Sequence, residues 1–164
     1  MKRIVLAVFA LVLVFFGGRA LLRALASDET KIQRLVATMV EGFNDTRNDP
    51  IREGLDVNFQ DENYGVDRDL VRVALAQIFL EAKDPATKKF LYHAEHTVGP
   101  IVITQGESGV PRATTDLEVA FSKRKGEVFE PAWTIRVHAT LEKKDGDWRF
   151  FRTATSTVSG AQIR

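Results

Sequence analysis

The chain of 164 residues holds 23 Lys and Arg, 22 Asp and Glu, three His and no Cys, for a formal net charge of +1. Four of the basic residues and none of the acidic ones lie within residues 1–26, so residues 27–164 carry 19 basic and 22 acidic side chains, a net charge of −3. An acidic domain argues against nucleic-acid binding, which depends on basic side chains that neutralise phosphates. A chain without Cys has neither disulfides nor thiolate chemistry.

The first residues have the pattern of a membrane-targeting segment. Lys2 and Arg3 precede an unbroken apolar run over Ile4–Phe16, as in the charged and apolar regions of a secretory signal. A signal peptidase accepts small side chains such as Ala24 and Ala26 ahead of its cut, so cleavage after Ala26 is one interpretation. It predicts a secreted protein that begins at Ser27.

The second interpretation is an uncleaved anchor. The apolar run of about 13 residues is shorter than the ~17–25 of a spanning helix, but residues 17–22 extend it if Arg19 places its guanidinium at the interface. Arg19 and Arg23 also charge the spacer before the cleavage site, which favours the anchor. We therefore expect residues 1–26 to be a signal anchor or a signal peptide. An anchor through residues 4–25 predicts a single-pass protein of the cytoplasmic membrane with its domain on the periplasmic or extracellular side.

Two amphipathic helices are predicted after this segment. Ser27 can cap a helix that begins at Asp28, and a second helix begins near Asp67 and stops at Asp84-Pro85. In each, apolar side chains recur at steps of three and four. The first stripe consists of Ile32, Leu35, Val36, Met39, Val40 and Phe43; the second consists of Leu70, Val71, Ala74, Leu75, Ile78, Phe79 and Ala82, widened by Val73 and Leu80.

Shorter elements are predicted between the two helices. Asp49-Pro50 predicts a short turn of helix, with Asp49 as its N-terminal cap and Pro50 at the first helical position. Residues 55–59 form a short extended piece, and residues 61–65 form a polar loop around Tyr64.

From Phe90 onward the apolar period changes from 3.6 to 2, which predicts strands. The first run covers residues 90–98 and resumes at 101–104 after Gly99-Pro100. Three longer strands follow over residues 113–122, 133–141 and 148–158, with Asp145-Gly146 as a hairpin turn. Strands joined by short turns make an antiparallel meander.

These elements predict one α+β domain over residues 27–160, with a short tail at 161–164. Both helices must bury their stripes, and a sheet that is apolar on one face must be covered. The economical arrangement is a curved antiparallel sheet wrapped around the helices, in a cone-like form, preceded by one N-terminal apolar helix.

The order of elements resembles the nuclear transport factor 2-like superfamily, also called the ketosteroid isomerase-like or cystatin-like cone fold. The resemblance covers roughly residues 28–158. It rests on the first helix over residues 32–43, on Tyr64-Gly65-Val66-Asp67-Arg68 before the second helix, and on the closing hairpin Asp145-Gly146-Asp147-Trp148-Arg149-Phe150. It implies a cone whose open end holds a pocket. Members include isomerases, dehydratases, polyketide cyclases and non-catalytic binding domains, so function must be argued from the site.

Strand alternation selects the candidate pocket residues. Tyr92, His96 and Trp133 share the apolar side of their strands, and Arg152 shares the side of Trp148 and Phe150. Together with Tyr64 on the loop at the mouth, they predict an aromatic pocket with a few polar groups. Two alternatives remain for Arg152, which are a β-bulge that turns it outward and a salt bridge in the core.

No catalytic, metal or cofactor site is predicted. His93 and His96 point to opposite faces of one strand and cannot share a metal. The resemblance implies a Tyr in the first helix region and an Asp base for a ketosteroid isomerase, but residues 28–45 contain no Tyr. Asp56 or Asp61 could serve as a base, but exposed loop carboxylates are usually solvated, and both are interpreted in that way.

We therefore expect a membrane-tethered or exported non-catalytic domain that binds a small apolar ligand or a protein partner. The alternative is an isomerase, dehydratase or cyclase that acts on a hydrophobic molecule, with His96 as its acid or base. A third hypothesis is a homodimer through the polar sheet face, which bears Asp116, Glu118, Arg136 and His138.

Overall fold

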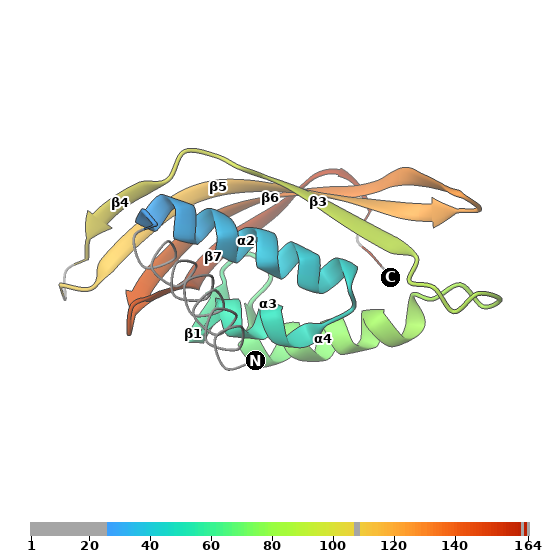
Figure 1. Cartoon of the computed structure of the whole chain (residues 1–164), viewed down its shortest axis with the longest axis horizontal. Coiled ribbons are helices and arrows are strands. Elements are labelled where there is room, and N and C mark those ends of the chain that lie inside the picture. The colour runs from blue at the N-terminus through green and yellow to red at the C-terminus, as the bar shows by residue number, and fades with distance from the viewer. Residues whose placement is uncertain (1–25, 107–108, 162, 164) are drawn as a thin grey trace, which may run out of the picture. The chain divides into compact units, whose positions relative to one another are not determined.

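The structure of the protein is a computed structural model, which describes residues 26–106, 109–161 and 163. The chain divides into two compact units, Met1–Ile32 and Gln33–Arg164. The architecture below is that of the second unit, in which helices cover one face of a curved, unclosed sheet (Figure 1). The predicted α+β fold class is confirmed; the predicted N-terminal apolar helix and its membrane span lie outside the described residues.

The helices are α2 (Asp28–Asn44), α3 (Asn48–Gly54) and α4 (Arg68–Glu81). The predicted cap at Ser27 is confirmed, because its Oγ accepts a hydrogen bond from the Thr30 amide at 3.3 Å. The predicted start of the second helix near Asp67 is also confirmed, and the Asp67 carboxylate caps it by accepting a hydrogen bond from the Leu70 amide at 2.8 Å. The start of α3 differs from the prediction: its N-cap is Arg47, which makes no side-chain capping bond, so Pro50 lies within the first turn.

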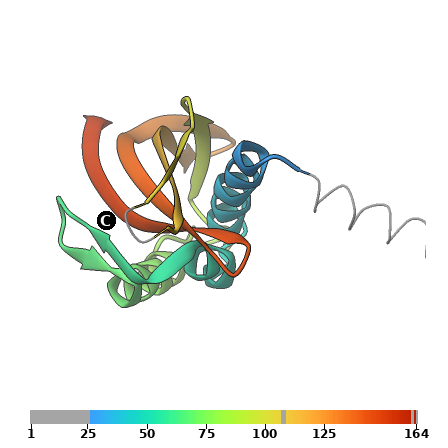
Figure 2. The ribbon, with the colours of Figure 1, turned by 90° about the vertical axis from the view of Figure 1, so that its left-hand side faces the viewer.

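Seven strands form one sheet in the described part of the chain, in the order β2-β1-β7-β6-β5-β3, with β4 also paired to β5. Their bounds are β1 (Leu55–Asp61), β2 (Val66–Asp67), β3 (Tyr92–Val98), β4 (Val102–Gln105), β5 (Pro111–Lys125), β6 (Val128–Lys144) and β7 (Asp147–Gly160). The long strands β5, β6 and β7 are the predicted meander, and Figure 2 shows them curling toward the helices.

One pairing within this sheet is parallel. The short extended piece predicted near residue 55 is strand β1, and it pairs parallel to β7, with Leu55 opposite Phe150 and Asp61 opposite Thr153. This pairing joins segments about 90 residues apart in sequence. Local periodicity carries no information about such a contact.

The β6–β7 turn shows why Asp145-Gly146 predicts a hairpin. Asp145 has φ of 55° and Gly146 has φ of 89°. Two successive positive φ values define the type I′ turn, whose twist matches that of the flanking strands, and Asp-Gly adopts it at low cost.

An aromatic cluster fills the core where α2 and α4 meet β3. The centroid of the Phe43 ring lies 5.8 Å from the ring centroid of Phe79, 5.4 Å from that of Phe90 and 5.3 Å from that of Phe121. Edge-on and tilted contacts at these distances stabilise the packing beyond the burial of area. The cluster fixes the helices on the sheet at this end.

The buried face of α4 is narrower than predicted. Phe79 and Ala82 are buried, and Val71, Leu75 and Ile78 pack against the core. Leu70, Val73 and Leu80 are more than half exposed, so their assignment to the buried stripe was wrong. The apolar side chains of α4 span a wider arc around the helix than the face that packs against the rest of the domain.

Candidate functional site

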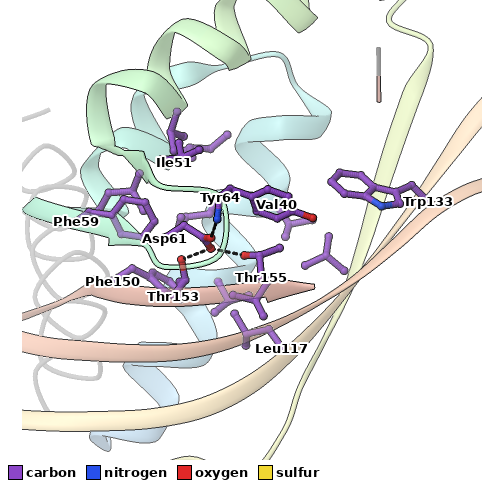
Figure 3. A pocket seen from close by; sticks show the side chains of 17 residues that line it. Val40, Ile51, Phe59, Asp61, Tyr64, Leu117, Trp133, Phe150, Thr153 and Thr155 are labelled. Atoms are coloured by element: carbon purple, nitrogen blue, oxygen red, sulfur yellow. Dashed lines mark hydrogen bonds between the residues drawn. The ribbon is translucent and has the colours of Figure 1, made fainter. Parts of the chain in front are cut away.

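A cavity of about 490 Å³ lies between the concave face of the sheet and the helices (Figure 3). This volume is within the ~300–1,000 Å³ of typical small-molecule sites. Most of its wall is aliphatic or aromatic. The lining residues are Val36, Met39, Val40, Ile51, Leu55, Phe59, Asp61, Tyr64, Val66, Val71, Leu117, Val119, Trp133, Val137, Phe150, Thr153 and Thr155.

The polar corner of the cavity is built around the Asp61 carboxylate, which is 5% exposed. Its Oδ1 accepts hydrogen bonds from the amides of Asn63 at 3.1 Å and Tyr64 at 2.9 Å. Its Oδ2 accepts from the hydroxyls of Thr153 at 2.8 Å and Thr155 at 2.6 Å. A carboxylate has about four acceptor sites, and all four are filled here.

This bonding holds Asp61 in its ionised form. Burial raises the pKa of Asp61, but the hydrogen bonds from Thr155, Tyr64, Thr153 and Asn63 together outweigh burial and lower the pKa below 3.8. The four hydrogen bonds occupy the lone pairs of Asp61, and through them Asp61 positions the turn and the two threonines in the wall.

Tyr64 stands at the mouth of the cavity. It belongs to the turn between β1 and β2. In this turn the Asp61 side chain accepts hydrogen bonds from two backbone amides, and Gly65 has a positive φ of 64°. Its side chain is 49% exposed and still counts among the lining residues. The turn therefore holds one aromatic ring across the entrance.

Trp133 closes another part of the wall from β6. Its ring stacks on Phe121 at 5.4 Å, which joins the cavity to the aromatic cluster. Its Nε1 donates a hydrogen bond to Thr157 Oγ1 at 3.1 Å, so the indole edge is fixed by β7.

The structure brings together two of the five predicted pocket residues. Tyr64 and Trp133 line the cavity, whereas Tyr92, His96 and Arg152 do not. Tyr92 is buried in the core beside Phe90 instead. His96 is half-buried on β3 opposite Val119 of β5, outside the wall.

A β-bulge displaces Arg152. Leu141 pairs with Phe150 and Thr140 pairs with Arg152, so Phe151 is an extra residue in β7. The bulge reverses the alternation beyond Phe150, and Thr153 faces the cavity. The Arg152 guanidinium binds Gln60 and lies 5.0 Å from the Phe151 ring.

The same bulge explains which site residues the sequence did not reveal. Strict alternation places Thr153 and Thr155 on the outer face, yet both line the cavity. Asp61 was taken as a solvated loop carboxylate, and it is a buried end residue of β1. The only sequence signal for it is its place just before the Asn63-Tyr64-Gly65 turn, where an Asp side chain commonly accepts backbone amides.

Asp56, the second aspartate taken as solvated, is also buried but lies outside the cavity wall. Its Oδ2 accepts from Lys144 Nζ at 2.9 Å, and Lys144 also contacts Glu142 at 3.2 Å. Burial raises the pKa of Asp56, but hydrogen bonds from the Asn58 amide and Lys144 outweigh burial and lower the pKa below its ordinary value. Arg112 completes this network through Glu142 at 2.8 Å.

Among the described residues, no group of three or more His, Asp or Glu side chains is placed to hold a metal ion. No helix in the same part of the chain has the length and apolar character needed to cross a membrane.

No protein-family model and no curated protein sequence matches the chain. Solved structures do match. A domain of unknown function with a cystatin-like fold from Nostoc punctiforme has a TM-score of 0.61 at 12% identity, covering 79% of this chain and 76% of that one. A nuclear transport factor 2-like protein with a cystatin-like fold from Novosphingobium aromaticivorans has a TM-score of 0.60 at 16% identity, covering 87% and 89%.

A third similar structure, from the same Novosphingobium species, is a candidate scytalone dehydratase. It has a TM-score of 0.60 at 18% identity and covers 84% of this chain and 89% of that one. At these identities the likeness concerns the fold. The chain has the cystatin-like cone fold of nuclear transport factor 2-like proteins, as the sequence predicted.

Proposed function

We propose that this chain is a non-catalytic binding domain whose cavity takes one small apolar molecule. The observation that carries this proposal is the cavity wall, which is apolar except at one corner, where the carboxylate has every acceptor site filled. The three histidines of the sequence lie outside this wall. The cavity therefore offers burial for a ligand without a free acid or base.

The corner also favours one kind of polar group on the ligand. Thr153 and Thr155 each donate their only hydroxyl proton to Asp61, so each hydroxyl oxygen can still accept a hydrogen bond from a ligand. A ligand hydroxyl or N–H can donate to these oxygens, whereas an ether or ester oxygen lacks the proton to do so. The proposed ligand is thus a hydrophobic molecule with one hydrogen-bond donor.

A fluorescence titration tests the cavity. The probe is N-phenyl-1-naphthylamine, an apolar amine with one N–H, and Val40→Trp fills the space from α2. We expect the probe to bind the wild type and its Kd to rise at least tenfold, about 1.4 kcal/mol, in this variant. Val158→Trp on the exposed end of β7 is the matched control and keeps the wild-type Kd. Equal binding by both variants contradicts the proposal.

Displacement of the probe tests the donor requirement. A straight-chain alcohol should displace it about five- to tenfold better than the methyl ether of the same alcohol, since one hydrogen bond contributes about 1 kcal/mol. Thr155→Val should reduce this preference. An ether that competes as well as the alcohol refutes the donor requirement and leaves apolar binding intact.

The enzyme alternative has one observation in its favour, which is that one similar structure carries the name of a candidate dehydratase. Its predicted acid or base was His96, and His96 does not line the cavity. His96→Ala is therefore expected to leave probe binding unchanged. Turnover of a hydrophobic substrate that Asp61→Asn abolishes would instead establish an enzyme.

We also propose that residues 1–26 deliver the domain to or across the cytoplasmic membrane. The support is the Ile4–Phe16 apolar run behind Lys2 and Arg3. Amino-terminal sequencing of the mature protein separates the two forms: Met1 at the start indicates a tether, and Ser27 indicates secretion after cleavage.

A further inference from the structure

One end of the domain combines basic and exposed apolar side chains. We call it the tip surface and define it as residues 80–93 and 121–131. Strand β5 ends with Lys123-Arg124-Lys125, and β6 begins after the turn with Val128 and Phe129. Val128 is 64% exposed and Phe129 is 37% exposed.

The two ranges lie side by side. The Leu91 amide donates to the Ala82 carbonyl at 2.9 Å, and the Arg124 amide donates to the Leu91 carbonyl at 2.7 Å. Arg124 in turn pairs with Phe129 across the hairpin. Figure 1 shows the loop after α4 and the β5–β6 hairpin projecting at the same end.

The charge of the tip surface is opposite to that of the rest of the domain. It holds six Lys and Arg and four Asp and Glu, whereas the remainder of residues 27–164 holds 13 basic and 18 acidic side chains. Cations are thus concentrated at one end of an acidic domain.

The loop that follows α4 carries two of these cations, Lys88 and Lys89, on a backbone held by hydrogen bonds. The Asp84 carboxylate accepts from the amides of Ala86 at 3.0 Å and Thr87 at 2.6 Å. The backbone of Asp84 also bonds with Lys88 at 2.8 Å and Lys89 at 2.9 Å. A loop closed in this way holds the two lysine side chains toward solvent.

An exposed apolar side chain lies next to each group of cations. Leu80, at the end of α4, is 74% exposed, and Val128 follows the Lys123-Arg124-Lys125 run. The Arg124 guanidinium lies 4.5 Å from the Phe129 ring and covers its face. Basic groups around protruding apolar ones match an anionic bilayer, where lysines meet phosphate head groups and apolar side chains enter the acyl boundary.

We propose that the tip surface docks on a bilayer of anionic phospholipids. Nucleic acid fits less well, because a polyanion offers no apolar phase for the exposed Val128 and Leu80 side chains. This docking is separate from ligand binding in the cavity, since no residue within 80–93 or 121–131 lines the cavity.

A single labelled cysteine tests the contact in the full-length chain, which has no Cys of its own. Val128→Cys carries the environment-sensitive fluorophore NBD at the tip surface. Val102→Cys on β4, also more than half exposed, carries it at the opposite end of the sheet as a matched control. The probe is a vesicle of phosphatidylcholine with 30% phosphatidylglycerol. We expect a blue shift and a rise in emission only for the Val128 label, whether or not the N-terminal segment is inserted.

Substitution of lysines by neutral glutamines tests the electrostatic contribution to docking on the bilayer. Lys88→Gln with Lys89→Gln should raise the lipid concentration for half-maximal change by about five-fold for each lysine that reaches the surface. Arg52→Gln with Arg72→Gln removes the same charge from exposed positions on α3 and α4 and should change it less than two-fold. High salt should weaken the response of the wild type.

Three results overturn the proposal. The first is an equal response of the Val102 and Val128 labels, or none from Val128. The second is an equal response with vesicles of phosphatidylcholine alone. The third is an equal change of the Val128 label on soluble polyphosphate, which assigns the tip surface to polyanions and not to a bilayer.

Discussion

The hydroxyl of Thr155 donates a 2.6 Å hydrogen bond to Oδ2 of Asp61, across a separation of 94 residues in the chain. The bond joins β7 to the end of β1, along the parallel pairing of these two strands. It therefore links the wall of the cavity to the stability of the sheet edge.

Thr155→Val replaces this hydroxyl with a methyl group of similar size. A hydrogen bond to a charged group contributes about 1.5–3 kcal/mol, and Thr155 is only half-buried, so we expect a loss of about 2 kcal/mol in the free energy of unfolding. Urea denaturation measures it. Thr97→Val on the exposed side of β3 is the control and should change the free energy by less than about 0.5 kcal/mol. Equal losses in both variants would contradict a special role for the Asp61 bond.

Stability should fall steeply in acid. The folded-state pKa of Asp61 lies below the ordinary value of 3.8, chiefly because hydrogen bonds outweigh burial. The unfolded chain then binds more protons than the folded one as the pH falls through this range. The stabilisation from Asp61 is thus present above about pH 4 and is lost as the pH falls through the folded pKa. Asp56, whose pKa is also lowered, adds a loss of the same sign.

Asp61→Asn isolates the contribution of Asp61. The free energy of unfolding, measured by urea titration from pH 6 to pH 2, should show a shallower acid slope than the wild type. Asp69→Asn makes the same change in net charge at a side chain that is 88% exposed and should keep the slope. An unchanged slope in Asp61→Asn shows that Asp61 does not couple folding to protons.

The Asn44 side chain should stabilise the edge of the sheet. At the end of α2, its Nδ2 donates to the Ala94 carbonyl at 2.9 Å and its Oδ1 accepts from the Ala94 amide at 2.7 Å. Strand β3 is an edge strand, so the amide satisfies backbone groups that no neighbouring strand pairs.

Asn44→Ala removes both bonds and leaves two partly buried backbone groups unpaired. We expect a loss of about 2–3 kcal/mol in the free energy of unfolding, together with faster hydrogen exchange at Ala94. Asn58→Ala, at an exposed position of β1, should change neither quantity. A loss below about 0.5 kcal/mol for Asn44→Ala contradicts the edge-pairing role.

Much of the fold followed from local patterns. The cap at Ser27, the helix start near Asp67, the Asp145-Gly146 turn and the inward side of β5 and β6 were predicted, because each depends on neighbouring residues alone. The side of β7 that faces the cavity was not, since one extra residue at Phe151 reverses the alternation without a composition signal.

The candidate site was predicted less completely for the same reason. Tyr64 and Trp133 line the cavity as predicted, whereas Arg152 follows the bulge at Phe151 and does not. Burial of Asp61 depends on the parallel pairing of β1 with β7, and a contact over this sequence distance has no local signature.

A homodimer through the outer face of β5 and β6 stays a prediction. That face carries two exposed cross-strand pairs, Asp116 with His138 at 2.9 Å and Glu118 with Arg136 at 3.5 Å. Exposed pairs of this kind stabilise a chain by about 0–1 kcal/mol. In a two-fold interface the same face meets its own copy, so each carboxylate can exchange its partner for a cation of the second copy.

Arg136→Glu tests this arrangement. Together with Asp116 and Glu118, the substituted side chain gives each copy three carboxylates on the face that meets the other copy. Light scattering on a chain that begins at Ser27 should give a dimer mass for the wild type at high concentration, and dimer affinity at least tenfold lower for Arg136→Glu. Arg72→Glu on α4 reverses the same charge away from the sheet and should leave the dimer intact. A wild type that stays monomeric at the highest concentration refutes the homodimer.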